Sequence, residues 1–263
     1  MKTVKNLRKY GKSPYNVVVL HGGPGASGEM APVAKELSKM HGILEPLPKK
    51  LTIDGQLEEL KNILQIEASL PITLIGYSWG AWLAFIFTSQ NPSFVKKLIL
   101  LSSGPFEESY VSSLANTRSR RLTEEDKLKR NDLLKIINSS ASMDKSKIFL
   151  DLVKYFKKTD SYNPLKDTNE EIEFNYDVYE SIWKEASELR KSGKLLDFGK
   201  KIHCPVVAIH GDYDPHPVEG VEKPLSVTLK KFHLILLRNC GHTPWIEKEA
   251  KEEFYKVLKR ELY

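Results

Sequence analysis

A serine, an aspartate and a histidine each follow a short apolar run in this sequence. They are Ser78, Asp214 and His242, in that order along the chain. A serine hydroxyl becomes a nucleophile when an imidazole accepts its proton, and a carboxylate holds that imidazole in the required tautomer. The set predicts acyl transfer to water, with Ser78 as nucleophile, His242 as general base and Asp214 as the orienting acid. Asp212 is the alternative acid.

Ser78 is the central residue of the pattern G-x-S-x-G, which reads GYSWG at residues 76–80. The apolar run ITLI at 72–75 precedes it and a helical stretch at 79–90 follows, which is the strand–turn–helix context of a nucleophile elbow. Such a turn is sharp and its serine is strained. Glycines at both flanking positions remove the Cβ atoms that would collide with neighbouring backbone.

A glycine-rich loop, HGGPG at 21–25, follows the apolar run YNVVVL at 15–20. Backbone N–H groups in such a loop can face a developing oxyanion. We expect the oxyanion hole to consist of the N–H groups of Gly23 and Trp79, with His21 shaping the loop through a hydrogen bond. Alternatively the glycines only permit a turn or bind a phosphate, although neither G-x-G-x-x-G nor a Walker sequence occurs.

Short apolar runs alternate with amphipathic stretches through most of the chain, which is typical of parallel strands joined by helices. We therefore predict an α/β fold whose mostly parallel sheet has helices on both faces. The expected strands are 15–20, 43–47, 72–75, 97–101, 206–209 and 233–237. The expected helices are 32–40, 54–69, 79–90, 222–230 and 244–262, the last starting at Thr243 and Pro244.

The pattern changes between 105 and 199, where apolar residues recur at helical spacing. So long a connection in a compact domain is rarely structureless, so we predict a helical lid at 105–199 over a core domain of 1–104 and 200–263. The lid includes an aromatic stripe, and three of its residues are candidate substrate contacts: Tyr176, Tyr179 and Trp183. Alternatively these side chains only pack the lid helices together.

The composition, with 41% hydrophobic and 28% charged residues among 263, is that of a folded globular protein. The longest apolar run, at 81–87, is far shorter than the ~20 residues that cross a bilayer, and the first residues have no apolar segment. We expect a cytoplasmic protein without stable membrane insertion. Cys204 and Cys240 are predicted at opposite ends of neighbouring strands, too far apart for a disulfide.

The net charge is +6, and residues 118–160 hold 12 basic and 7 acidic side chains interleaved at helical spacing. This pattern indicates solvated helix faces, or else a basic surface that steers anionic substrates. No run of five or six like charges occurs, and the charge by itself does not exclude nucleic acid. The partner we expect is a small-molecule substrate and not a nucleic acid. The oligomeric state stays open.

The motifs and their order resemble those of the α/β-hydrolase superfamily, over everything except the insertion, which lies where that family has its lid. The resemblance implies the α/β-hydrolase fold and a serine hydrolase that needs no cofactor. Ser78 matches the family's nucleophile, His242 its general base and Asp214 its acid. Haloalkane dehalogenases and epoxide hydrolases have an aspartate at the elbow, so the serine argues against both.

The sequences HGGPG and GYSWG are also similar to those of the proline iminopeptidase group, whose lid carboxylates hold the substrate's free amine. Between the two motifs this chain lacks that group's acidic segment rich in arginine and glycine. Hydrolysis of a carboxylic ester, thioester or amide is therefore the main expectation, and aminopeptidase activity is the alternative. The acidic lid residues that could hold an amine are Glu170, Glu171, Glu173, Asp177 and Glu180.

Two further readings stay open. A ligand receptor could keep the hydrolase fold and pocket without turnover, because fold does not dictate function. The other is a metal site, which would leave Ser78 without its expected partner. Its ligands would be His210, Asp212, Asp214 and His216.

Overall fold

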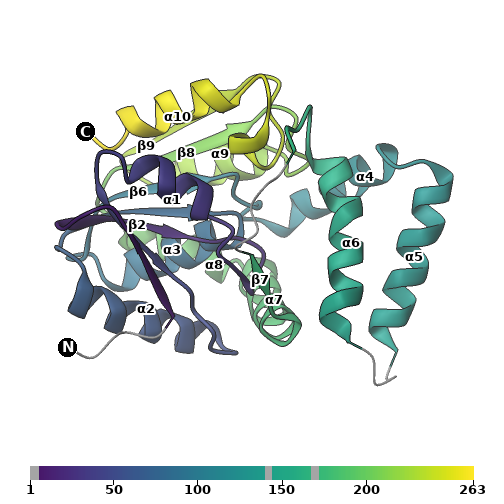
Figure 1. Ribbon diagram of the computed structural model, residues 1–263, viewed down its shortest axis with the longest axis horizontal. Coiled ribbons are helices and arrows are strands. Elements are labelled where there is room, and N and C mark those ends of the chain that lie inside the picture. The colour runs from purple at the N-terminus through teal and green to yellow at the C-terminus, as the bar shows by residue number, and fades with distance from the viewer. Residues whose placement is uncertain (1–5, 140–143, 167–171) are drawn as a thin grey trace.

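A seven-stranded sheet forms the centre of the computed structural model, which describes residues 6–139, 144–166 and 172–263 (Figure 1). Its strands are β1 Leu7–Tyr10, β2 Tyr15–Leu20, β4 Gly42–Pro46, β5 Ile72–Tyr77, β6 Val95–Leu101, β8 Val206–Gly211 and β9 Phe232–Leu237. The spatial order is β1-β4-β2-β5-β6-β8-β9. Only β1 is antiparallel to its neighbour, so the predicted mostly parallel sheet is confirmed. The polar sequence of β1 gave no strand signal.

Helices cover both faces of the sheet, because successive residues of the central strands are apolar and point to opposite faces. Val18 of β2 joins one buried cluster and Val19 joins the other. In Figure 1, α1 and α10 lie above the sheet, and α2 and α3 lie below it. These helices and α9 have the following bounds: α1 Ala31–Leu37, α2 Ile53–Glu67, α3 Trp79–Gln90, α9 Glu219–Thr228 and α10 Lys251–Arg260.

The predicted helix at 244–262 is wrong in its first part. A 3₁₀ turn covers Pro244–Ile246, and α10 begins only at Lys251. The reason is Glu247, whose backbone is extended and whose side chain is buried. Its carboxylate accepts hydrogen bonds from the backbone N–H groups of Tyr162, Asn163 and Gly241. The tertiary contacts of this one side chain outweigh the local helix preference.

The segment between β6 and β8 is mainly helical in its described part. Its α-helices are α4 Val111–Arg120, α5 Glu124–Asn138, α6 Lys145–Asp160, α7 Tyr176–Lys191 and α8 Lys194–Asp197. Helices α5 and α6 pack side by side and project from the sheet (Figure 1), and they share a small apolar cluster with Tyr176 at the start of α7. Helix α7 instead packs against the main core through Val178, Ile182 and Ala186.

A two-stranded ribbon links this segment to the glycine-rich loop. Its strands are β3 Ala26–Ser27 and β7 Glu173–Phe174, which pair antiparallel. The sequence analysis predicted neither strand. The ribbon fixes the start of α7 beside the loop that follows β2.

No helix in the described ranges is long and apolar enough to cross a membrane. Both cysteines are free, as predicted. Cys204 precedes β8, and Cys240 follows the parallel neighbour β9, so the two residues lie at opposite ends of the sheet.

The order in which successive strands join the sheet reverses at β2. The next strand of the chain in this sheet, β4, lies on one side of β2, and the one after it, β5, lies on the other. In parallel sheets, ligands bind outside the carboxyl ends of the strands at such a switch point. The loops after β2 and β5 meet there, and the loops after β8 and β9 end at the same edge.

The elbow glycines give the first prediction. A Cβ at Gly76 would lie 2.1 Å from the carbonyl oxygen of Gly80, whereas a Cβ at Gly23 would meet nothing within 4 Å. Gly76→Ala is therefore expected to lower the free energy of unfolding by about 1–3 kcal/mol or more, and Gly23→Ala is the matched control. Urea denaturation measures the free energy of unfolding of both variants. Equal values would contradict the backbone crowding at Gly76.

Candidate active site

The turn between β5 and α3 presents Ser78 in a strained conformation. Ser78 has φ 51° and ψ −115°, and its N–H donates to the carbonyl oxygen of Leu101 at 2.9 Å. Gly80 permits the turn because a Cβ there would lie 2.5 Å from the carbonyl oxygens of Leu20 and His21. The serine thus stands at the carboxyl edge of the sheet, before the first residue of a helix.

Three side chains from separate loops form one hydrogen-bonded chain. His242 Nε2 lies 3.1 Å from Ser78 Oγ, and His242 Nδ1 lies 2.7 Å from Asp214 Oδ2. The alternative acid, Asp212, does not reach the histidine, because its Oδ1 accepts the N–H of Cys240 at 3.2 Å. This geometry can move a proton from the serine hydroxyl to an imidazole held by a carboxylate.

Burial and charge shift the two titrating partners in the directions that this proton transfer needs. Burial alone would raise the pKa of the Asp214 carboxyl, but the neighbouring histidines hold it well below its usual range. Burial alone would lower the pKa of His242, but Asp214 outweighs it and the pKa is raised above its ordinary value. Asp214 is therefore ionised at neutral pH and His242 is a strengthened base.

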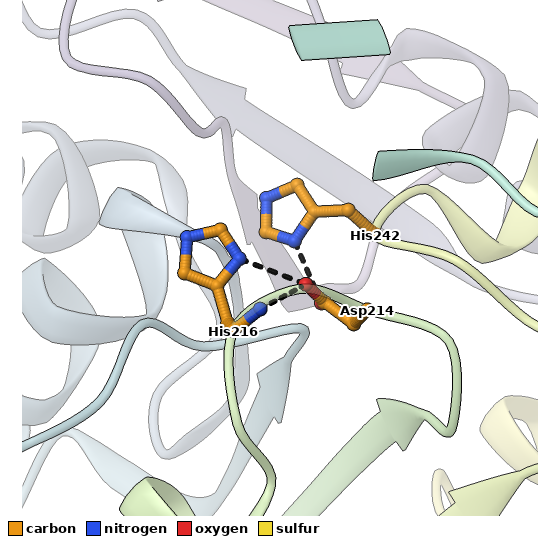
Figure 2. Close-up of side chains that lie close together, drawn as sticks. All are labelled: Asp214, His216 and His242. Atoms are coloured by element: carbon orange, nitrogen blue, oxygen red, sulfur yellow. Dashed lines mark hydrogen bonds and ion pairs between the residues drawn. The ribbon is translucent and has the colours of Figure 1, made fainter. Parts of the chain in front are cut away.

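Two more histidines, His216 and His210, lie close to the same carboxylate, and Figure 2 shows the first of them. His216 Nδ1 lies 2.8 Å from Asp214 Oδ1, and the His216 backbone N–H donates to that oxygen at 2.9 Å. His210 Nε2 lies 2.8 Å from the carbonyl oxygen of His216. The sequence analysis considered His210 and His216 only as metal ligands. Their GDYDPH context at a strand end was the one signal for this arrangement.

The alternative metal set of His210, Asp212, Asp214 and His216 is not assembled. In the described part of the chain, the side chains whose ligand atoms come within 4.8 Å of one another are Asp214, His216 and His242. Both histidines of this group already contact the carboxylate through hydrogen bonds. Asp212 points to the loop at Cys240 instead.

A cavity of about 500 Å³ opens beside the serine. Gly23, Ser78, Trp79 and His242 line it. Trp79 is the first residue of α3, and N–H groups of a first helical turn have no acceptor within the helix. The two residues expected to supply the oxyanion N–H groups thus line the same cavity as the serine. His21, in contrast, is buried with its Nδ1 3.0 Å from the carbonyl oxygen of Gly22, and burial lowers its pKa to about 4.

Aromatic rings from two elements form one wall of the cavity. Trp82 of α3 stacks on Trp183 of α7 at 5.9 Å, and Trp183 stacks on Tyr179 at 6.4 Å. Tyr179 and Trp183 line the cavity, but Tyr176 does not. The expectation for Tyr176 needs correction, because its ring packs beside Phe149 in the cluster of the inserted helices. Helical spacing put all three on one stripe, but the cavity meets only its later part.

Of the acidic residues expected to hold an amine, those that the structure describes do not line this cavity. Glu173, Asp177 and Glu180 are exposed and do not line it, while Glu170 and Glu171 lie outside the described residues. The carboxylates that do line the cavity are Glu29 and Asp160. Neither was predicted, because each is an isolated acid without a motif.

Asp160 forms a two-bond ion pair with Arg118, one bond being Nε to Oδ1 at 2.9 Å. The Asp160 carbonyl oxygen also accepts the backbone N–H of His242 at 2.7 Å. The end of α6 is thereby connected directly to the loop that carries the histidine. Arg118 and Arg190 also line the cavity, and Arg190 forms a separate ion pair with Glu108 at 2.8 Å.

The model of the alpha/beta hydrolase fold family matches residues 45–248. The chain belongs to this family. Solved structures agree on the fold: the structure titled "Crystal structure of VinJ" has a TM-score of 0.70 at 17% identity, covering 97% of this chain and 93% of that one.

Curated relatives cover nearly the whole chain. A proline iminopeptidase of Heyndrickxia coagulans is 29% identical, over 92% of this chain and 88% of the relative. A proline iminopeptidase of Saccharolobus solfataricus is also 29% identical, over 93% of this chain and 83% of the relative. The solved proline iminopeptidase of Mycobacterium smegmatis has a TM-score of 0.63 at 17% identity, covering 97% and 93% of the two chains.

The second prediction concerns Asp214. Asp214→Asn is expected to lower kcat for an activated ester by about 10⁴-fold, because an amide does not fix the imidazole tautomer. Since Asp214 raises the pKa of His242 above 6.5, wild-type kcat/KM should fall as the pH drops through a midpoint above 6.5. The residual activity of Asp214→Asn should fall at a lower pH.

Asp212→Asn is the matched control, because its side-chain oxygen can still accept the N–H of Cys240. It should keep most of the activity and the wild-type pH midpoint. Rates measured from pH 5 to 9 test both variants. A larger loss in Asp212→Asn would transfer the role of acid to that residue.

Proposed function

We propose that this protein is a serine hydrolase that cleaves an acyl bond through a covalent intermediate on Ser78. The observation that carries the proposal is the continuous chain Ser78–His242–Asp214, with contacts of 3.1 and 2.7 Å. Membership of the alpha/beta hydrolase family supports it. A receptor would have no need for this alignment of hydroxyl, base and acid at a strained turn.

In the proposed reaction, His242 removes the Ser78 proton as the serine oxygen attacks the substrate carbonyl. The backbone N–H groups of Gly23 and Trp79 stabilise the oxyanion, and His242 then gives its proton to the leaving group. A water molecule activated by His242 hydrolyses the acyl-enzyme. Asp214 stays ionised and stabilises the imidazolium, so these steps need no cofactor.

Residues 105–199 act as a lid over the core of 1–104 and 200–263 in this proposal. Tyr179 and Trp183 contribute to the cavity from this segment, and Gly23 and Ser78 contribute from the core. An apolar cover excludes water, which strengthens the hydrogen bonds to the oxyanion.

The relatives support an amide bond after an N-terminal proline as the first candidate substrate. Two proline iminopeptidases at 29% identity align over more than nine-tenths of this chain. Glu29 is the cavity carboxylate suited to bind a substrate amine. It lies beside the glycine-rich loop, where its Oε2 accepts a hydrogen bond from the N–H of Gly22 at 3.0 Å.

A carboxylic ester or thioester is the second candidate, and the charges of the cavity favour it. Asp160 is neutralised by Arg118, and Arg190 is neutralised by Glu108, whose Oε2 lies 2.8 Å from Arg190 Nε. The exposed acids of α7 lie outside the cavity. This lining suits a neutral acyl compound better than a cationic amine.

The third prediction tests the nucleophile and separates the substrates. Ser78→Ala should lower hydrolysis of every substrate by about 10⁴-fold or more while folding is retained. A fluorophosphonate probe should label wild-type Ser78, as mapped by mass spectrometry, and should not label the variant. Near-wild-type turnover by Ser78→Ala would refute the proposal.

For the wild type, kcat/KM is measured on proline arylamides and on p-nitrophenyl esters. A clear preference for the arylamide supports the iminopeptidase candidate, and ester turnover without arylamide turnover supports the second candidate.

The fourth prediction concerns the aromatic wall. Trp183→Ala and Tyr179→Ala should change the ratio of kcat/KM between short-chain and long-chain esters, by the equivalent of about 1–3 kcal/mol per lost apolar contact. Tyr176→Ala is the control, because that ring lies outside the cavity lining. Its profile over chain length should run parallel to the wild type, and parallel profiles for all three variants would contradict the assignment of the wall.

A further inference from the structure

His216 contacts both the acid and the base of the proposed triad. Its Nδ1 and its backbone N–H both bond to Asp214 Oδ1, so that the other oxygen, Oδ2, is left to face His242. Its ring also stacks on the His242 ring, with centroids 4.4 Å apart and planes inclined by 26°. The side chain of Asp214 is fully buried, so these contacts are not shared with bulk water.

The hydrogen bonds define the tautomers of both rings. An ionised carboxylate only accepts, so Nδ1 carries the proton in His216 as well as in His242. Burial lowers the pKa of His216 to about 4 despite the nearby carboxylate, so its ring is neutral at neutral pH. In Figure 2, the Nδ1 atoms of both rings point toward Asp214 and the Nε2 atoms lie on the sides away from it.

We propose that His216 is a positioning residue that orients the Asp214 carboxylate and covers one face of the His242 ring. The inference rests on the proposed serine hydrolase function. Without the side-chain donor, the carboxylate can rotate and Oδ2 no longer meets His242 Nδ1 in one fixed geometry. Without the ring, water reaches the imidazolium that forms as Ser78 attacks.

The groups around His242 decide the expected pH effect. Asp214 and Asp160 favour its protonated form and Arg118 opposes it, while His210 approaches Asp214 Oδ2 at 3.6 Å. These groups remain when His216 is replaced. Loss of the His216 ring exposes His242 to water, and burial is the largest effect that lowers the pKa of His242, so this pKa should rise.

Three substitutions separate the donor from the ring. His216→Asn keeps a donor close to the position of Nδ1 but loses the ring, His216→Phe keeps a ring without the donor, and His216→Ala loses both. His233→Asn is a control at a half-exposed histidine outside the cavity lining. Each variant is compared by kcat and kcat/KM on a p-nitrophenyl ester from pH 5 to 9, and by its thermal midpoint.

We expect His216→Ala to lower kcat about tenfold or more, the usual effect of losing a hydrogen bond to a charged group. The acidic limb of its kcat/KM profile should move to higher pH. His216→Asn should recover most of kcat, whereas His216→Phe should not, and His233→Asn should match the wild type.

Wild-type kcat and an unshifted acidic limb in all three variants would overturn the inference. Equal losses in the Asn, Phe and Ala variants, in step with lower thermal midpoints, would also overturn it, because a purely structural role predicts them. A wild-type protein that neither turns over the ester nor reacts with the fluorophosphonate at Ser78 would instead refute the proposed function itself.

Discussion

The Asp214 carboxylate is a buried charge, and the local structure around the candidate site supplies its partners. An ion without water must receive hydrogen bonds or opposite charge, or it takes up a proton. Here the loop after β8 supplies the N–H and ring of His216, and the loop after β9 supplies His242. Asp214 can stay ionised only while both loops are in place. The stability of this edge of the sheet and the basicity of His242 therefore depend on the same contacts.

The same edge depends on close contacts between backbones. Gly76 and Gly80 allow β5 to turn into α3 within contact distance of the β2 loop, so Ser78 reaches His242 and the cavity. Glu247 adds a third constraint, because its buried carboxylate accepts three backbone N–H groups from the histidine loop and from the segment after α6. The serine and the histidine are thus each held by backbone contacts that do not involve their own side chains.

The inserted helices contribute to the site unequally. Helix α7 packs into the main core and brings Trp183 against Trp82, whereas α5 and α6 project from the sheet and meet only the start of α7, through Tyr176 and Tyr179. The link between α6 and the core is at its end, where Asp160 accepts the His242 N–H and pairs with Arg118. Substrate contacts in this segment and the position of the proposed base are therefore structurally connected.

The sequence by itself determined the sheet apart from β1, the helices that cover it apart from the start of α10, and the four loops at its carboxyl edge. These follow from periodicity and from glycine-rich turns at strand ends. It also put Ser78, Asp214 and His242 in a recognisable order. Only the tertiary structure decided which aspartate meets the histidine, that His216 shares that carboxylate, and that Tyr176 is outside the cavity while Glu29 and Asp160 are inside. The physical reason is that these contacts join residues from different elements. The spacing of residues along one helix or loop shows which of them share a face, but it does not show which other element packs against that face.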